Sequence, residues 1–130
     1  MAVLATTSAL TAKNGGMDAR DAVDAVERAV AELVAALPAG VVVTEQDAGE
    51  KYRFDWTHDA RAGHPAAVVR AEDADHVVTT MRWASRHGIP VVPRGAGTGL
   101  SGGALAVDGG IVLSTERMRA VEIDVDARVA

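Results

Sequence analysis

A glycine-rich run at residues 93–103 constrains the fold of this chain more than any other feature. Five of its eleven residues are glycine, and it directly follows an apolar, largely β-branched stretch at residues 89–92. Glycine permits positive φ and removes side chains, so successive backbone N–H groups can face one concavity. Such a concavity suits an anion, above all a phosphate or a diphosphate. Thr98 and Ser101 add hydroxyl donors to it, and Arg94 adds a permanent positive charge.

Three interpretations of this run compete. Three of its glycines match the G-x-G-x-x-G fingerprint of the Rossmann fold: Gly97, Gly99 and Gly102. That fingerprint requires a helix that opens at the last glycine, and only residues 104–107 precede the turn at 108–110. This short interval argues against the Rossmann match. An NAD-binding dehydrogenase module stays open as an alternative, and a helix starting near Gly102 would support it. A Walker loop is excluded because no Gly-Lys-Ser/Thr occurs. The third possibility is a surface turn that binds nothing.

Hydrophobic periodicity predicts an alternation of helices and strands. Apolar residues at three- and four-residue steps between Val23 and Leu37 predict a helix that Pro38 ends. A second helix is expected at residues 73–87, with Gly88 as its left-handed cap. The other expected elements are strands at 41–43, 66–69, 89–92, 111–113 and 121–125, a short helix at 44–52 and an exposed polar loop at 55–64. The strand–helix–strand unit at 66–92 favours a parallel pair, and the fold class is α/β (α+β), with a small, mainly parallel sheet and flanking helices.

Composition narrows the class of protein. Apolar residues make up 48% of the 130 and charged residues 24%, so the chain can bury a core. A net charge of −5 argues against nucleic acid as a partner. The absence of cysteine excludes disulfides and thiolate zinc sites. No apolar run reaches the length of a membrane span, and residues 1–16 lack a basic region, so we expect a flexible leader and a cytoplasmic protein.

At the glycine run the chain becomes recognisable. Residues 88–103 resemble the FAD-binding domain of the vanillyl-alcohol oxidase type flavoproteins, also called the PCMH-type domain. Within that family, the likeness is to the FAD subunit of bacterial glycolate oxidase and to D-lactate dehydrogenases. The resemblance extends from about Tyr52 to Ala130 and includes Arg53-Phe54-Asp55-Trp56-Thr57 and the segments 65–69, 83–88 and 109–113.

The resemblance implies where the cofactor binds. In this family the arginine-glycine loop wraps the FAD diphosphate with its backbone amides. Carried over to this chain, the cofactor-binding residues are Arg94, Gly95, Ala96, Gly97, Thr98, Gly99, Leu100, Ser101, Gly102 and Gly103. Some relatives link the flavin covalently through a histidine of this loop. Since no histidine is present there, the resemblance implies non-covalent FAD.

The resemblance also implies an activity and a domain organisation. The family reaction is the oxidation of a 2-hydroxy acid, such as glycolate or D-lactate, by transfer of a hydride to flavin, which another electron acceptor reoxidises. We expect a leader at 1–16, a helical and strand segment at 17–64, and the first lobe of a two-lobe FAD-binding domain at 65–130. That lobe is expected to be incomplete at its C-terminal end, so the chain alone is expected to be inactive. A truncated reading frame is the preferred explanation; a partner chain that completes the site, or a non-catalytic lobe that serves as an interaction module, is the alternative.

No residue is predicted to be catalytic or to bind a metal. His58 lies in a polar loop without a second histidine at ligand spacing, and His87 in the last turn of a predicted helix favours the helix dipole. Trp83 is expected to pack within the fold. Trp56 is expected in a loop, where it could touch a neighbouring domain.

Overall fold

The computed structural model describes residues 18–129, and the leader predicted at 1–16 lies outside them. A four-stranded sheet forms its centre, with the strand order β1-β2-β4-β3. β1 is antiparallel to β2, whereas β2, β4 and β3 run parallel to one another. The strands are β1 (Val42–Val43), β2 (Ala67–Arg70), β3 (Val91–Arg94) and β4 (Ile111–Ser114). The α/β class with a mainly parallel sheet is therefore confirmed.

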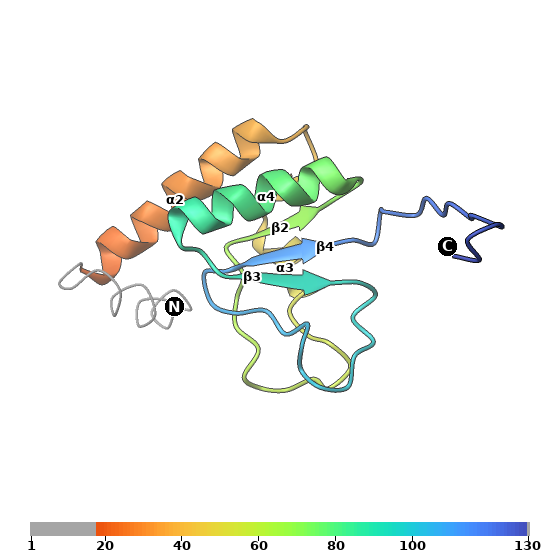
Figure 1. Ribbon diagram of the computed structural model, residues 1–130. Coiled ribbons are helices and arrows are strands. Elements are labelled where there is room, and N and C mark those ends of the chain that lie inside the picture. Colours follow the sequence, from red (N-terminus) through yellow and green to blue (C-terminus); the bar gives the residue numbers. More distant parts are fainter. Residues whose placement is uncertain (1–17, 130) are drawn as a thin grey trace.

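Two helices, α2 (Ala19–Ala36) and α4 (Ala74–His87), lie over one face of the sheet (Figure 1). The sequence favours α2 because its apolar residues recur on one face. These positions are buried: Ala22, Val26, Ala29, Val30 and Leu33. The helix ends at Ala36, shortly before Pro38, which cannot continue it.

Helix α4 ends at the predicted residue, His87, and begins at Ala74, one residue after the predicted start. Asp73 caps its start, where the side chain accepts a hydrogen bond from the backbone N–H of His76 at 2.9 Å. Gly88 ends it in the left-handed conformation with φ 66°. Between these caps, Trp83 is buried and its indole Nε1 donates to the backbone oxygen of Ala29 at 2.8 Å. This bond joins α4 to α2 across the core.

Successive side chains of a strand point to opposite faces of the sheet, so the strands contribute to two apolar layers. The layer beneath the helices takes Ala67 and Val69 of β2 with Ile111 and Leu113 of β4. The intervening residues face the opposite layer, which consists of Tyr52, Val68, Ala106 and Val112. The loops at 51–66 and 95–110 pass on that side of the sheet, away from α2 and α4 (Figure 1). The short helix α3 (Gln46–Glu50) leads into the first of these loops.

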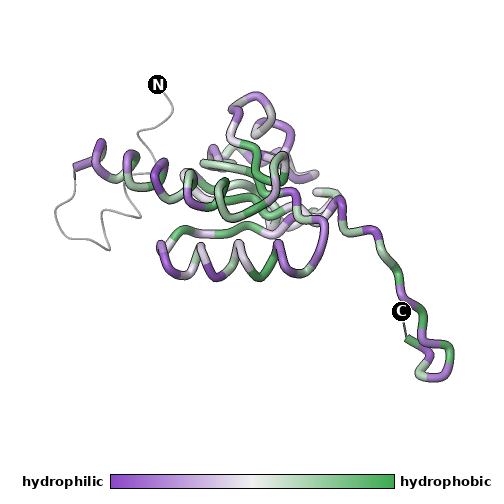
Figure 2. The backbone as a smooth tube through the Cα atoms, turned by 90° about the horizontal axis from the view of Figure 1, so that it is seen from above, coloured by the Kyte–Doolittle hydropathy of each residue, from purple (hydrophilic) through white to green (hydrophobic). Residues whose placement is uncertain are grey.

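Two sequence predictions about strands need correction. The unit at 66–92 is parallel, but β2 and β3 do not pair with each other, because β4 inserts between them. The predicted strand at 121–125 does not form: Asp124 makes only an isolated bridge to Val129. This part of the chain extends away from the sheet (Figure 2), and Ile123 is 71% exposed. Alternation indicates only a local preference, and a strand also needs a neighbouring strand to accept its hydrogen bonds.

Two side chains considered in the sequence analysis, His87 and Trp56, lie at the surface of the fold. His87 stands beside Glu32 of α2, with Nε2 3.0 Å from the carboxylate. Trp56 is 66% exposed, in a loop as predicted. Within residues 18–129, no helix is long and apolar enough to cross a membrane.

Candidate functional site

The ten residues predicted to bind the diphosphate form one continuous loop. Arg94 ends β3, and residues 95–103, here called the glycine loop, follow it without a helix before β4. The loop leaves the carboxyl end of a parallel strand, which is where open α/β sheets commonly bind ligands. No helix forms between β3 and β4, and the Rossmann fingerprint requires one at its last glycine. The structure therefore does not support an NAD-binding Rossmann module.

The glycines of the loop serve two different purposes. Gly97 and Gly102 both have φ near +75°, a conformation that residues with a Cβ rarely adopt. A Cβ added at Gly95, Gly99 or Gly103 would meet no atom within 4 Å. These three positions border open space, so backbone there can approach a ligand closely. Side chains of Thr98, Leu100 and Ser101 are exposed along the same stretch.

Arg94 turns back beneath the loop. Its Nη1 donates to the backbone oxygen of Phe54 at 2.7 Å, and its guanidinium carbon lies 5.9 Å from the centre of the Tyr52 ring. A Cβ at Gly97 would overlap this guanidinium, lying 2.7 Å from Nη1. Among the ion pairs of residues 18–129, none includes Arg94. Its positive charge is therefore not paired with a carboxylate among these residues.

The far end of the loop is fixed to the same segment. Leu105 N–H donates to the Gly102 oxygen at 3.3 Å and closes a turn, and Ala106 N–H donates to the Arg53 oxygen at 3.0 Å. Arg53 and Phe54 are neighbours in sequence. Two consecutive backbone carbonyls, those of Arg53 and Phe54, thus accept hydrogen bonds from both ends of the loop, at Ala106 and at Arg94.

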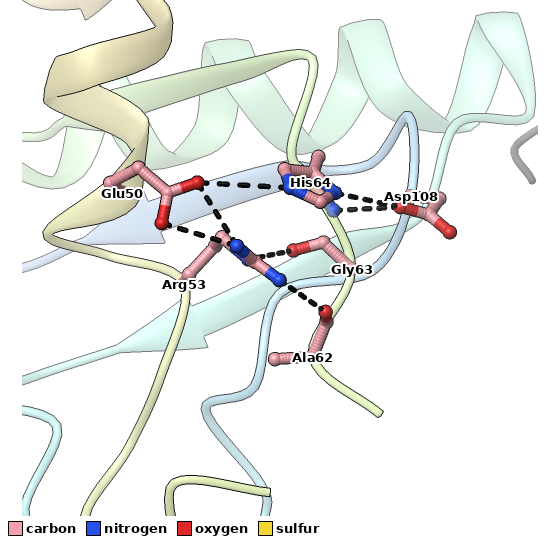
Figure 3. Close-up of polar contacts among 6 residues, drawn as sticks. All are labelled: Glu50, Arg53, Ala62, Gly63, His64 and Asp108. Carbon is pink, nitrogen blue, oxygen red and sulfur yellow. Dashed lines mark hydrogen bonds and ion pairs between the residues drawn. The ribbon is translucent and has the colours of Figure 1, made fainter. Parts of the chain in front are cut away.

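Arg53 is itself held by a polar cluster (Figure 3). Its guanidinium donates to the backbone oxygens of Ala62 and Gly63, both at 3.1 Å, and pairs with Glu50 at 3.0 Å. The His64 ring lies 3.7 Å from the Glu50 carboxylate and 3.6 Å from that of Asp108. The cluster ties α3 to the residues that enter β2 and to the turn before β4.

Asp55 follows this anchoring segment and is 2% exposed, although the sequence predicts an exposed loop there. The sequence pattern missed it because a carboxylate at the start of a largely polar stretch, residues 55–64, is ordinarily exposed. The Oδ1 atom accepts hydrogen bonds from Thr57, from the backbone N–H at 3.0 Å and from the hydroxyl at 2.5 Å. These bonds hold the pKa of Asp55 below its usual value of 3.8 despite the opposing effect of burial, and the backbone amides of Ala104 and Gly102 lower it further.

A second cluster of polar side chains lies at the carboxyl edge of the sheet. No pattern in the sequence predicts that its residues lie together. The Tyr52 hydroxyl donates to the Glu116 carboxylate, 64 residues away, and Lys51 lies 3.8 Å from the same carboxylate. Burial raises the pKa of Tyr52 above 10.0, and Glu116 raises it further, while Arg70 acts in the opposite direction. This group secures Tyr52, over whose ring Arg94 lies.

Comparison with protein families and curated sequences gives consistent matches. The family model described as FAD binding domain matches residues 65–130. A D-lactate dehydrogenase of Archaeoglobus fulgidus is 45% identical over 84 residues, which are 62% of this chain and 19% of that protein. A D-2-hydroxyglutarate dehydrogenase of Xanthomonas citri pv. viticola is 39% identical over 89 residues, 68% of this chain and 19% of that protein. The chain thus spans about a fifth of the length of the curated relatives it matches.

Solved structures show the same fold. A p-cresol methylhydroxylase with bound substrate aligns with a TM-score of 0.63 at 24% identity, over 78% of this chain and 20% of that one. A 4-ethylphenol oxidase from Gulosibacter chungangensis aligns with a TM-score of 0.65 at 21% identity, over 87% of this chain and 22% of that one. At these identities, the likeness describes the fold alone.

Proposed function

The chain belongs to the FAD binding domain family, and from this premise we propose that its glycine loop binds the diphosphate of FAD. The observation that carries the proposal is the pairing of an open, glycine-lined backbone with an arginine that has no carboxylate partner among residues 18–129. Backbone N–H groups and a guanidinium are both well suited to diphosphate oxygens.

The loop has the space and the charge that this cofactor needs. Gly99 and Gly103 leave room for a diphosphate to approach the main chain, because a Cβ at either position would project into open space. The exposed hydroxyls of Thr98 and Ser101 can donate further hydrogen bonds. No histidine lies in the loop to which the flavin could be attached, so we assign FAD a non-covalent mode of binding.

The reaction that we propose for the whole protein is the oxidation of a 2-hydroxy acid such as glycolate or D-lactate. The support comes from the curated relatives, which are named for D-lactate, D-2-hydroxyglutarate and, in the Bacillus subtilis protein, glycolate. When bound, FAD supplies the hydride-accepting chemistry. The role of this chain's residues is to bind and orient the diphosphate, and none of them is assigned to substrate.

We further propose that residues 65–130 are the first lobe of a two-lobe domain. The segment at 17–64 contributes α2, β1 and the anchoring peptide of the glycine loop. Further protein, in the same or another chain, would supply the rest of the flavin pocket, the substrate site and the route to an electron acceptor. We place this assembly in the cytoplasm.

Titration of the purified chain with FAD tests the proposal. We expect saturable binding of FAD, followed by quenching of flavin fluorescence, and much weaker binding of FMN and riboflavin, which lack the diphosphate. NAD is included because it also contains a diphosphate, and a preference for NAD over FAD would support a nicotinamide module. Failure to bind any of these ligands, with the fold intact by circular dichroism, would refute the proposal and favour an interaction module.

A glycine variant links binding to the loop. Gly99→Val adds a side chain where the structure has open space, so we expect an intact fold and loss of FAD binding. The matched control is Gly49→Ala in α3, where the new Cβ would meet only Pro65 at an ordinary 3.8 Å. Retention of FAD by Gly99→Val would show that the diphosphate lies elsewhere.

A further inference from the structure

The guanidinium of Arg94 is held by one hydrogen bond and by the ring of Tyr52. Its Nη1 donates to the backbone oxygen of Phe54 at 2.7 Å, and its other N–H donors have no hydrogen-bond partner among residues 18–129. A single hydrogen bond leaves the guanidinium free to turn about it. The guanidinium carbon lies over the Tyr52 ring, 5.9 Å from its centre, within the distance of about 6 Å at which the face of an aromatic ring attracts a cation. The ring is therefore a second point of contact for this side chain.

Tyr52 is fixed in the fold at both ends. Its backbone N–H donates to the Gly49 oxygen at 2.9 Å, and its hydroxyl donates to the Glu116 carboxylate beyond β4. Between these bonds the residue is 4% exposed and packs with Val68 of β2 and Val112 of β4. The ring is thus anchored to the sheet although its backbone lies in a loop, and it can act as a support.

The guanidinium also lies directly against the backbone of the glycine loop. A Cβ at Gly97 would lie 2.7 Å from Nη1, so the missing side chain leaves room for the charge beneath the loop. A long side chain loses rotamer freedom when a ligand fixes it, and a neighbour that has already fixed it removes this cost from binding. A support for Arg94 in the free chain would therefore strengthen the binding of an anion at the loop.

We propose that Tyr52 is a positioning residue, whose ring holds the guanidinium of Arg94 beneath the glycine loop before the ligand binds. Glu116 contributes by fixing the hydroxyl end of the ring. The proposal rests on the proposed function for the identity of the ligand, the diphosphate of FAD. Because Tyr52 is buried and Arg94 lies over its ring, Tyr52 acts through the arginine and is assigned no contact with the diphosphate.

The mobility of the Arg94 side chain in the flavin-free chain tests this role directly. Nitrogen relaxation measured by NMR reports the order of the Arg94 Nε group, and the buried indole Nε1 of Trp83 serves as the internal measure of an intact core. In Tyr52→Leu we expect the order parameter of Arg94 to fall below about 0.6, the range of flexible groups, while that of Trp83 stays unchanged. Tyr52→Phe keeps the ring but frees its hydroxyl end, so an intermediate value is expected.

Phe54→Leu is the matched control. It also replaces an aromatic ring by leucine, but this ring stacks on His58, with the two ring centres 5.9 Å apart. The backbone oxygen of Phe54 that accepts from Arg94 is kept. We therefore expect the order of Arg94 and the affinity for FAD to match those of the unaltered chain.

FAD titration of the same variants is the second measurement. We expect the Kd to rise about tenfold in Tyr52→Leu and about threefold in Tyr52→Phe, the effect of releasing one side chain that binding must then immobilise. Because the loss comes through Arg94, Tyr52→Leu is expected to change the Kd no further in the Arg94→Gln background. A merely structural effect of Tyr52 would weaken binding equally in both backgrounds.

The outcomes separate the two proposals. An Arg94 side chain that stays ordered in Tyr52→Leu, or a Kd that rises equally in both backgrounds, would overturn the positioning role. If Tyr52→Leu also disorders Trp83, the fold is lost and Tyr52→Phe decides: an unchanged order parameter and an unchanged Kd would then overturn it. An unaltered chain that binds no FAD would refute the proposed function, and the relaxation measurements would still decide whether Tyr52 holds Arg94.

Discussion

The guanidinium of Arg94 occupies the space directly beneath Gly97, so neither residue can change without affecting the other. A Cβ at Gly97 would lie 2.7 Å from Nη1, and the glycine has φ +75°. The start of the glycine loop is thus built around one side chain that points inward. The backbone conformation of Gly97 favours glycine, and its lack of a side chain leaves the Arg94 guanidinium in place.

Replacement of Gly97 by alanine is therefore expected to destabilise the fold. The positive φ should lower the free energy of unfolding by about 1–3 kcal/mol, and the flexible Arg94 side chain would have to move aside. Urea denaturation followed by circular dichroism measures this change. Gly99→Ala is the control, because its Cβ would meet nothing within 4 Å, and its effect should stay within about 0.5 kcal/mol. Equal effects of the two variants would contradict the left-handed conformation of Gly97.

The two tryptophans should differ sharply in their contribution to stability. Trp83 is 2% exposed and donates to Ala29 of the other helix, so Trp83→Ala should cost about 3–5 kcal/mol. Trp56 is 66% exposed, and Trp56→Ala should change the free energy of unfolding by less than about 0.5 kcal/mol. Thermal or urea denaturation distinguishes these values. A small loss at Trp83 would mean that α2 and α4 do not pack as described.

The carboxyl group of Asp55 should titrate below 3.8 in the folded chain. Its folded pKa is lowered, so its contribution to stability is present above the unfolded pKa and is lost as the pH falls through the folded pKa. Carbon NMR of the carboxyl group measures the pKa. Thr57→Val removes the largest cause of the shift and should move the value upward. Asp59, with a pKa of about 2 held by Arg61, should be unaffected by Thr57→Val and should rise in Arg61→Gln.

Tyr52 offers an opposite pH dependence with an unambiguous signal. It is the one tyrosine of the chain, so tyrosinate absorbance reports on it alone. Its raised pKa means that its contribution to stability is present below the unfolded value of 10.0 and is lost as the pH rises through the folded pKa. Glu116→Gln should lower the pKa of Tyr52, although burial should keep it above 10.0. An unchanged pKa in that variant would contradict the contact between Tyr52 and Glu116.

Local patterns in the sequence identify most elements of this fold. The apolar spacing of α2 and the left-handed Gly88 each depend on neighbours within a few residues, so periodicity and capping rules predict them. The position of the glycine loop after β3 follows in the same way. The likeness to a flavoprotein family indicates which loop is functional. In the structure this loop has glycines that border open space and an arginine at its start.

The parts that sequence reasoning missed depend on contacts between distant residues. Asp55 begins a largely polar stretch of the sequence, yet it is buried in the folded chain. The contact of Tyr52 with Glu116 spans 64 positions. The predicted strand at 121–125 fails for the converse reason, because its alternating pattern finds no neighbouring strand within the described residues. Burial of polar groups and strand pairing are both settled by tertiary structure.

The attachment of both loop ends to two consecutive backbone carbonyls separates the length of the loop from the geometry of the sheet. Because Arg53 and Phe54 hold Ala106 and Arg94, the distance between the two ends is set outside the loop. Residues inserted or deleted between these points would change the shape of the glycine loop without displacing β3 or β4. The fold can therefore accommodate evolutionary variation in its ligand at this loop while the scaffold beneath it stays the same.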